Sequence, residues 1–255
     1  MLMSGKAMRH LNVQIITVTA CILAFVSISA FGKKLSVSVG WTKPPYVIEK
    51  MNSGFELELV KAVYKRMGHH LEFVYVPFGR SNKLINAGKV DAALTMTQKM
   101  DVKGLHLSDP YIVYQNAAIS LKGRGIDLQS IEALRHHSIV GFQNASIVLG
   151  RNYKLAVEQS PLYLELPDQR TQVEMLLKGK VDVVVMDINI FNYLSREFIG
   201  RSHMDNVDIH RLFPSSPYKM AFSDPKLRDI FNKQLVDFKK SEEFQDLIKE
   251  YEFIQ

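Results

Sequence analysis

The sequence predicts an α/β fold made of two similar lobes. Beyond residue 32, short runs of β-branched and aromatic residues alternate with segments of helical periodicity, which favours an α/β arrangement over an all-β fold or a helical bundle. The tetrapeptide Gly-Lys-Val-Asp occurs at 88–91 and again at 179–182, each time between an amphipathic helix and an apolar strand. A long extended run follows each half, at 111–121 and at 218–223. We therefore expect two β-α-β-α-β units joined by two crossover strands.

The first unit begins directly after the N-terminal leader. Apolar residues at helical spacing predict a helix over Phe55–Met67, which ends at Gly68, a residue type that tolerates the left-handed turn at a helix end. Runs of β-branched and aromatic residues predict the strands. The other expected elements are the strands Leu35–Trp41, Leu71–Phe78 and Val90–Met96 and the short helix Ser81–Ala87.

The second unit repeats this order after residue 137. Its expected elements are the strands Ser138–Phe142, Tyr163–Leu166 and Val181–Met186 and the helices Ala145–Ala156 and Gln172–Lys178. After the second crossover, Ser223-Asp224-Pro225 predicts a helix start, because proline suits the first helical turn. Two C-terminal helices follow, and we expect them to pack on the first lobe. The predicted boundaries are 33–115 for the first part of lobe 1, 116–217 for lobe 2 and 218–255 for the return to lobe 1.

Residues 1–32 have the features of a signal peptide. Two basic residues precede an apolar run over 11–31, and small residues offer a cleavage site after Ala30 or Gly32. We expect cleavage there and a soluble, monomeric protein in the periplasm. Two alternatives stay open: the run could remain as a membrane anchor of about 20 residues, or Cys21 could carry a lipid. Mass spectrometry of the exported N-terminus distinguishes the cleaved leader, the retained anchor and the lipidated Cys21.

The composition of the mature chain excludes several classes of protein. Cleavage would remove Cys21, the single cysteine, and with it disulfide and thiolate chemistry. The formal charge falls from +6 to +4 without the two basic leader residues, and no basic run interleaved with aromatic residues suggests nucleic acid. The HExxH, GxSxG and phosphate-loop motifs are missing, as is a closely spaced carboxylate set for calcium. We expect no metal, no cofactor, no nucleic-acid partner and no catalysis.

Candidate binding residues lie where the predicted strands end. In open parallel sheets, ligands bind beyond the carboxyl ends of the strands, where side chains and helix N-termini converge. The residues at these ends provide aromatic faces, hydroxyl and amide groups, cations and one acid, which suit a small polar or zwitterionic solute. They are Trp41, Lys43, Tyr46, Phe78, Arg80, Thr95, Thr97, Gln143, Asn144, Ser146 and Asp187.

Several of these residues also have a purely structural interpretation. Trp41 and Phe78 suit a hydrophobic core, and Thr95 suits a hydrogen-bonded hydroxyl inside a strand. Arg80 and Lys43 could be ordinary surface cations. Asp187 interrupts an apolar run and precedes a helix, so it also suits the N-cap position.

The order and spacing of short motifs carry a resemblance through nearly the whole mature chain. The motifs are Pro45-Tyr46, Gly54-Phe55-Glu56-Leu57-Glu58-Leu59, Leu107-Ser108-Asp109-Pro110-Tyr111 and the two Gly-Lys-Val-Asp tetrapeptides, the second of which leads to Asp187. In these the chain resembles the family 3 extracellular solute-binding proteins, the periplasmic receptors of polar amino acid ABC transporters. The resemblance implies a periplasmic binding protein fold, with two αβ lobes joined by two hinge strands.

The resemblance also implies roles for individual residues. Phe78 matches the aromatic residue that stacks on the ligand, and Thr95 and Thr97 match hydroxyl residues of the ligand loop. Residues 143–146 match a second-lobe loop that contacts the ligand, and Asp187 matches the acid that receives the ligand ammonium. We expect Phe78 and Asp187 to face one cleft from opposite lobes.

One departure from the family concerns the ligand carboxylate. In amino acid receptors of this family an arginine after the hydroxyl loop clamps that group, whereas Asp101 stands at the corresponding position here. A carboxylate cannot replace a guanidinium fork that pairs bidentately with an anion. Either Arg80 or Lys43 supplies the charge from another direction, or the ligand has no α-carboxylate at that point.

The leading hypothesis is a periplasmic binding protein that delivers a small polar, amino-acid-like solute to the permease of an inner-membrane ABC importer. Its cleft would close by hinge motion at the two crossover strands. One alternative is a periplasmic dehydratase-like enzyme on the same fold, for which Asp187, Asp101 and Glu56 are the only candidate acids or bases. Another is a ligand-sensing receptor for a membrane signalling partner.

Overall fold

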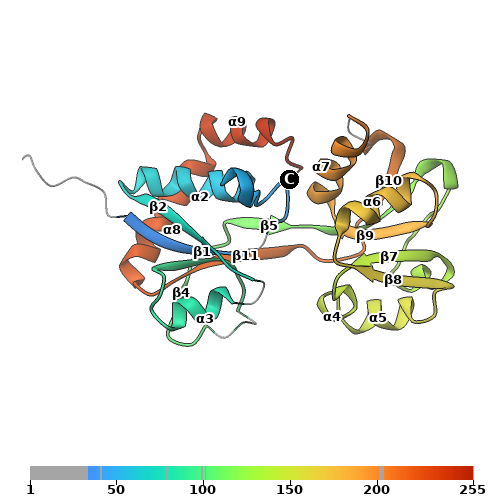
Figure 1. Ribbon diagram of the computed structural model, residues 1–255, viewed down its shortest axis with the longest axis horizontal. Coiled ribbons are helices and arrows are strands. Elements are labelled where there is room, and N and C mark those ends of the chain that lie inside the picture. The colour runs from blue at the N-terminus through green and yellow to red at the C-terminus, as the bar shows by residue number, and fades with distance from the viewer. Residues whose placement is uncertain are drawn as a thin grey trace, which may run out of the picture.

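Two lobes lie side by side along the long axis of the molecule, and the extended strands β5 (Ile112–Tyr114) and β11 (Ser216–Phe222) run between them (Figure 1). The computed structural model describes residues 34–40, 42–77, 80–98, 100, 102–200 and 204–254. Each lobe has its own β-sheet with helices on its faces. Within the described ranges, no helix has both the length and the apolar character needed to cross a membrane.

The first lobe is built on a mixed sheet whose strands come from both ends of the chain. The order is β2-β1-β3-β11-β4, with β5 paired to β11. β1 is parallel to β2 and β3, whereas β11 is antiparallel to β3, because it enters the sheet on the return from the second lobe. The elements are the strands β1 (Lys34–Val39), β2 (His70–Tyr75), β3 (Ala92–Met96) and β4 (His106–Leu107), the helices α2 (Phe55–Arg66), α3 (Ser81–Asn86), α8 (Pro225–Lys239) and α9 (Glu242–Glu250), and the 3-10 helix η1 (Glu49–Met51).

The second lobe has a sheet of order β10-β6-β9-β7-β8. β7 is parallel to β8 and β9, and β6, which continues from the first crossover, is antiparallel to β9. The elements are the strands β6 (Asn116–Leu121), β7 (Ser138–Phe142), β8 (Leu162–Leu166), β9 (Val183–Asp187) and β10 (Val207–His210), the helices α4 (Ala145–Val148), α5 (Arg151–Val157), α6 (Gln169–Leu177) and α7 (Ile188–Ile199), and the 3-10 helices η2 (Lys122–Arg124), η3 (Glu132–His136) and η4 (Met204–Asn206).

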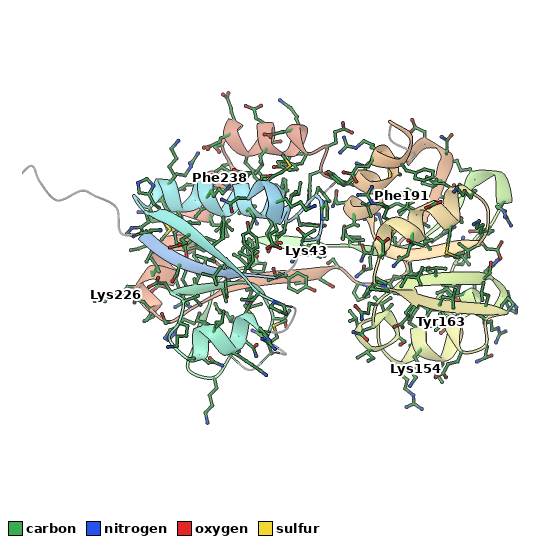
Figure 2. All side chains as sticks on the ribbon, viewed as in Figure 1. Lys43, Lys154, Tyr163, Phe191, Lys226 and Phe238 are labelled. Atoms are coloured by element: carbon green, nitrogen blue, oxygen red, sulfur yellow. The ribbon has the colours of Figure 1, made fainter. Side chains whose placement is uncertain are left out.

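Each lobe buries aromatic side chains between its sheet and its helices. Phe238 of α8 and Phe191 of α7 are fully buried, one in each lobe (Figure 2). Helix α8 begins as predicted: the Asp224 carboxylate accepts a hydrogen bond from Lys226 N at 2.8 Å, and Pro225 occupies the first turn. This start directs the apolar face of α8 onto α2, so the C-terminal helices complete the first lobe.

The two Gly-Lys-Val-Asp tetrapeptides have the same structural role. Ser36 N and Oγ both donate to Asp91 Oδ2 at 2.9 Å, and Ser138 N and Oγ donate to Asp182 Oδ2 at 2.9 and 2.7 Å. In each pair the aspartate amide donates back to the serine Oγ. Each aspartate thus joins the end of a helix-strand connection to the first strand of its own unit. The predicted two-lobed α/β fold is confirmed.

One predicted element is wrong. The expected helix Ala145–Ala156 forms two short helices, α4 and α5, because Gly150 adopts a φ of +90° and interrupts the helix. The other expected elements are found with their ends shifted by a few residues. For example, β9 begins at Val183 instead of Val181.

Gly54 lies directly before α2, at a position where a side chain does not fit. Its φ is +124°, and a Cβ atom there would collide with the backbone carbonyl of Tyr46. We expect Gly54→Ala to lower the free energy of unfolding by about 2 kcal/mol, because backbone strain and the collision add. Gly68→Ala is the control: φ is +76° but the surrounding space is open, so the loss should be about 1 kcal/mol. Equal losses in urea titrations would contradict the steric argument.

Candidate functional site

The N-terminus of α2 meets the proline-rich turn that follows β1. The carbonyl oxygens of Pro45 and Tyr46 accept hydrogen bonds from Phe55 N at 2.8 Å and Glu56 N at 3.1 Å. These bonds satisfy two of the amides that a helix leaves without intrahelical partners. They also fix Glu56 in the first turn, where its side chain is fully buried.

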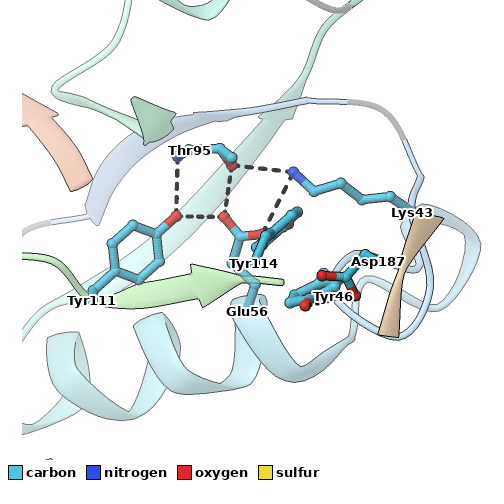
Figure 3. Close-up of polar contacts among 7 residues, drawn as sticks. All are labelled: Lys43, Tyr46, Glu56, Thr95, Tyr111, Tyr114 and Asp187. Carbon is cyan, nitrogen blue, oxygen red and sulfur yellow. Dashed lines mark hydrogen bonds and ion pairs between the residues drawn. The ribbon is translucent and has the colours of Figure 1, made fainter. Parts of the chain in front are cut away.

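Four side chains surround the Glu56 carboxylate (Figure 3). Oε1 accepts hydrogen bonds from the Tyr111 hydroxyl and from Thr95 Oγ1, the latter at 2.7 Å. Oε2 accepts from the Tyr114 hydroxyl at 2.8 Å. Lys43 Nζ lies 3.5 Å from Oε2 and donates to Thr95 Oγ1 at 3.2 Å. Both oxygens of the buried carboxylate are therefore engaged.

These surroundings keep Glu56 ionised. Burial by itself raises the pKa of a carboxyl group, because a charge is poorly solvated inside a protein. Here the ammonium of Lys43 and the three hydroxyl donors outweigh burial, and the pKa of Glu56 is lowered. A carboxylate in this state is suited to holding its neighbours in place, not to transferring a proton.

Thr95 lies at the edge of a small pocket in the first lobe. Its φ is +56°, and its amide donates to the Tyr111 hydroxyl at 3.0 Å, which turns this end of β3 toward Glu56. The pocket has a volume of about 80 Å³, and Lys43 lines it near the hinge strands (Figure 2). Its size suits one functional group of a ligand, because sites for whole small molecules usually exceed about 300 Å³. The polar lining consists of Lys43, Ser81, Asn82, Thr95 and Tyr218.

Asp187 ends β9 and caps α7 in the second lobe, with only 3% of its surface exposed. Oδ1 accepts hydrogen bonds from the amides of Asn189 at 2.9 Å and Ile190 at 3.1 Å, and Oδ2 accepts from the amide of Gln115 at 2.8 Å. Burial raises the pKa of Asp187 to about 6 in spite of these bonds. The N-cap interpretation of this residue is confirmed.

Tyr46 connects the two lobes. Its hydroxyl donates to Asp187 Oδ1 at 2.9 Å, and its ring stacks on Tyr114 with the ring centroids 3.8 Å apart. Because Tyr114 donates to Glu56, a continuous chain of contacts runs from Glu56 in the first lobe to Asp187 in the second (Figure 3). A change in the angle between the lobes must alter this chain.

In the second lobe, Glu165 of β8 holds the loop between β7 and α4. Its Oε2 accepts a hydrogen bond from Asn144 N at 2.7 Å, and its Oε1 accepts from Ser146 N at 2.8 Å and from the Tyr163 hydroxyl at 2.7 Å. Burial raises the pKa of Glu165, but the hydrogen bonds outweigh it and the net shift is downward. The carboxylate therefore accepts hydrogen bonds from the amides of Asn144 and Ser146, which are then not free to bind an anionic ligand. It also adds a negative charge at this end of the lobe.

The structure brings some of the predicted binding residues together in pairs. Lys43 bonds with Thr95 and Tyr46 bonds with Asp187, whereas the amides of Asn144 and Ser146 both donate to Glu165 and not to each other. Within the described ranges, Arg80, Thr97 and Gln143 form no hydrogen bond or ion pair with another predicted residue. Trp41, Phe78 and Asp101 lie outside the described residues, so the facing of Phe78 and Asp187 stays a prediction.

Sequence reasoning missed Tyr111, Tyr114 and Glu165 as parts of these clusters. The two tyrosines lie in an extended run where aromatic residues are common, and Glu165 lies on a strand where a polar residue normally faces solvent. Glu56 was expected only as a candidate acid or base. The sequence does hold one signal: Glu56 stands between the apolar residues Phe55 and Leu57 at a helix start, which indicates a buried acid. A buried carboxylate requires hydrogen-bond donors around it.

Comparisons with known proteins agree on one family and one fold. Residues 35–254 match the bacterial extracellular solute-binding proteins, family 3. Among curated proteins, none matches the chain. An ancestral arginine-binding protein bound to arginine is 25% identical, with a TM-score of 0.60 over 86% of this chain and 97% of that chain.

Two further solved structures share the fold. An ancestral amino acid-binding protein that is a precursor of cyclohexadienyl dehydratase is 21% identical, with a TM-score of 0.63 over 86% of this chain and 94% of that chain. A histidine kinase sensor domain with similarity to periplasmic binding proteins is 18% identical, with a TM-score of 0.63 over 88% of this chain and 97% of that chain.

Proposed function

The chain belongs to the bacterial extracellular solute-binding proteins of family 3, and from this we propose that it captures a small polar, amino-acid-like solute between its two lobes. The observation that carries the proposal is the chain of contacts from Glu56 to Asp187 across the junction of the lobes. It gathers hydroxyl groups, a cation and two buried acids where the lobes meet. A few converging polar groups of this kind orient a small ligand.

The charges of the second lobe favour a solute that carries an ammonium group. Asp187 receives this group by exchanging its hydrogen bond with the Tyr46 hydroxyl, and Glu165 provides a second carboxylate. The ancestral protein bound to arginine supports a cationic amino acid as the solute class. In this proposal the remaining contacts come from the aromatic, hydroxyl and amide residues expected at the strand ends, namely Trp41, Phe78, Thr95, Thr97, Gln143, Asn144 and Ser146.

Arg80 is the better of the two candidate anchors for a ligand carboxylate. Its side chain is exposed before α3 and has no hydrogen bond or ion pair within the described part of the chain. Lys43 lies 3.5 Å from the Glu56 carboxylate, so its charge is already balanced. A guanidinium can also bind a carboxylate through two parallel hydrogen bonds.

Replacing Arg80 by alanine should therefore weaken the binding of an amino acid by about 1.5 to 3 kcal/mol, the loss expected for a charge-assisted hydrogen bond. Calorimetry of each variant measures the dissociation constant. Lys83→Ala removes an exposed cation of α3, the helix that follows Arg80, and this matched control should bind as the wild type does. Asp101→Ala should leave binding intact or improve it. Unchanged affinity in Arg80→Ala would place the carboxylate elsewhere.

We also propose the route of this solute. The leader over 1–32 directs the protein to the periplasm, where the loaded protein docks on the permease of an ABC importer. The lobes, divided at 33–115, 116–217 and 218–255, close on the solute by bending at β5 and β11. Deletion of the gene for that permease should abolish uptake of the solute while the purified protein still binds it.

Two observations favour other functions on the same fold. The similar histidine kinase sensor domain supports a ligand-sensing role, in which loss of the protein would change gene expression but leave uptake intact. The dehydratase precursor, together with a pKa of about 6 for Asp187, supports an enzyme. Against the enzyme, backbone amides donate to both oxygens of Asp187, and such bonds favour the ionised acceptor that pairs with an ammonium group over a proton donor. If the purified protein released water from a cyclohexadienyl substrate, an enzyme would be favoured over a binding protein.

A thermal-shift screen tests the proposed function directly. The compounds are amino acids, polyamines and organic acids, each added to the purified mature protein. A ligand at about 100 times its dissociation constant adds about 2.7 kcal/mol of stability. We expect a cationic amino acid to give the largest shift. Stabilisation by organic acids alone would contradict the role assigned to Asp187.

A further inference from the structure

A groove of about 450 Å³ lies beside β5, between the two lobes. Its walls come from α2, α8 and α9 of the first lobe, from the first turn of α7 in the second lobe, and from residues 253–254. Figure 1 shows the C-terminus between α2 and α7. None of the predicted solute-binding residues that the structure describes lines this groove, so it is distinct from the proposed solute site.

The floor of the groove is apolar. Phe55 and Phe253 stack with ring centroids 3.8 Å apart, and Ile112 and Ile188 continue the same surface along β5 and α7. Asp and Glu are missing from the described lining residues. Among the described residues, the lining of the groove is thus largely apolar and contains no acidic side chain.

Two cations line the groove, one from each lobe. Arg211 is exposed and has no hydrogen bond or ion pair in the described part of the chain. Among the described residues, Lys239 donates one hydrogen bond, to Pro110 O at 3.2 Å. The amide of Asn189 is not available to a ligand, because it is paired with the backbone of Ile254 at 2.7 and 3.1 Å. Among the described lining residues, the charged groups left for a ligand are therefore both positive, beside the neutral Gln115 and Ser215.

We propose that this groove binds a small apolar carboxylate, with its hydrocarbon part on the floor and its carboxylate at Arg211 and Lys239. The volume is in the range of small-molecule sites, which are mostly apolar with a few polar groups. Burial of the hydrocarbon supplies the free energy of binding. The two cations select an anion over a neutral or cationic molecule of the same shape.

The position of the groove couples it to the angle between the lobes. The C-terminal segment that forms one wall also ties α7 to the first lobe, through the Asn189–Ile254 pair and the Arg196–Glu252 ion pair. A ligand that contacts both lobes binds open and closed forms with different affinity, so it must change the affinity for the solute, and the solute must change its affinity by the same factor. This coupling rests on the proposed function, whereas binding in the groove does not.

Calorimetry with octanoate tests the site, because octanoate has one carboxylate and a flexible apolar chain. We expect saturable binding of one octanoate per chain, and much weaker binding of octanol and octyltrimethylammonium. Arg211→Gln and Lys239→Gln should each weaken octanoate about tenfold, the factor that corresponds to one charge-assisted contact. Ser215→Trp, which places a large side chain at the groove, should abolish binding.

The matched controls are Arg151→Gln and Lys233→Gln, both exposed cations away from the groove, and both should bind octanoate as the wild type does. Equal affinity for octyltrimethylammonium, or unchanged octanoate binding in Arg211→Gln and Lys239→Gln, would overturn the proposal. The thermal-shift screen for the solute is repeated on Arg211→Gln and Lys239→Gln. Loss of octanoate binding with solute binding retained shows that the two sites are separate, so failure of one proposal leaves the other standing.

Discussion

Replacing Glu56 by alanine should lower the free energy of unfolding by about 3 to 5 kcal/mol, the range for breaking a buried ion pair. The substitution removes the acceptor of the hydroxyl groups of Tyr111, Thr95 and Tyr114, and it leaves the Lys43 ammonium without its carboxylate. A buried donor without an acceptor costs about 1 to 3 kcal/mol. Urea unfolding followed by circular dichroism measures the loss.

Helix α2 itself provides the control for this prediction. Glu58, one half-turn further along, pairs with Lys61 at 2.8 Å, but both side chains are one-third exposed. Glu58→Ala should therefore cost only about 0.5 kcal/mol, as for an ion pair on a helix surface. If the two alanine variants unfolded at similar urea concentrations, the Glu56 cluster would contribute little, and the polar junction of the lobes would not depend on it.

Local patterns predicted the regular elements well. The helix starting at Phe55 and the strand Ser138–Phe142 follow from apolar periodicity and from end signals that act within a few residues. The helix expected over 145–156 failed for a local reason as well, since Gly150 adopts a left-handed backbone that a periodicity count does not register. The repeated tetrapeptide predicted the duplicated lobes, because its aspartate makes the same serine contacts in both.

The polar clusters were less predictable, because they depend on contacts between distant segments. Tyr46 and Asp187 are 141 residues apart, and no local pattern indicates that the first donates to the second. Asp187 itself was identified from its place at a strand end, but its burial and its raised pKa appear only when both lobes surround it. Glu165 required knowledge of which strand lies beside β7. Strand order is a tertiary property, and the strand alternation at Glu165 predicts only a solvent-facing residue.

Asp187 should also give the protein a pH-dependent stability. Burial raises the pKa of its carboxyl to about 6 in the folded protein, above the value of about 3.9 in an unfolded chain. The folded state therefore binds this proton more tightly than the unfolded state does. Its stabilising effect is complete below about pH 4 and is lost as the pH rises through 6. An ammonium ligand pairs with the ionised form, so its affinity should rise with pH over the same range.

Comparison of the wild type with Asp187→Asn isolates this titration, because asparagine has no ionisable proton. We expect the unfolding free energy of the wild type minus that of the variant to fall by about 3 kcal/mol between about pH 4 and pH 7, as measured by urea unfolding at each pH. Asp182→Asn gives the opposite sign: burial raises the pKa of Asp182, but the Ser138 bonds and Arg124 outweigh it, so the difference should shrink on acidification below about pH 4. A flat profile for Asp187→Asn would show that the folded protein does not raise the pKa of this carboxyl, because its hydrogen bonds to Tyr46, Gln115, Asn189 and Ile190 offset the effect of burial.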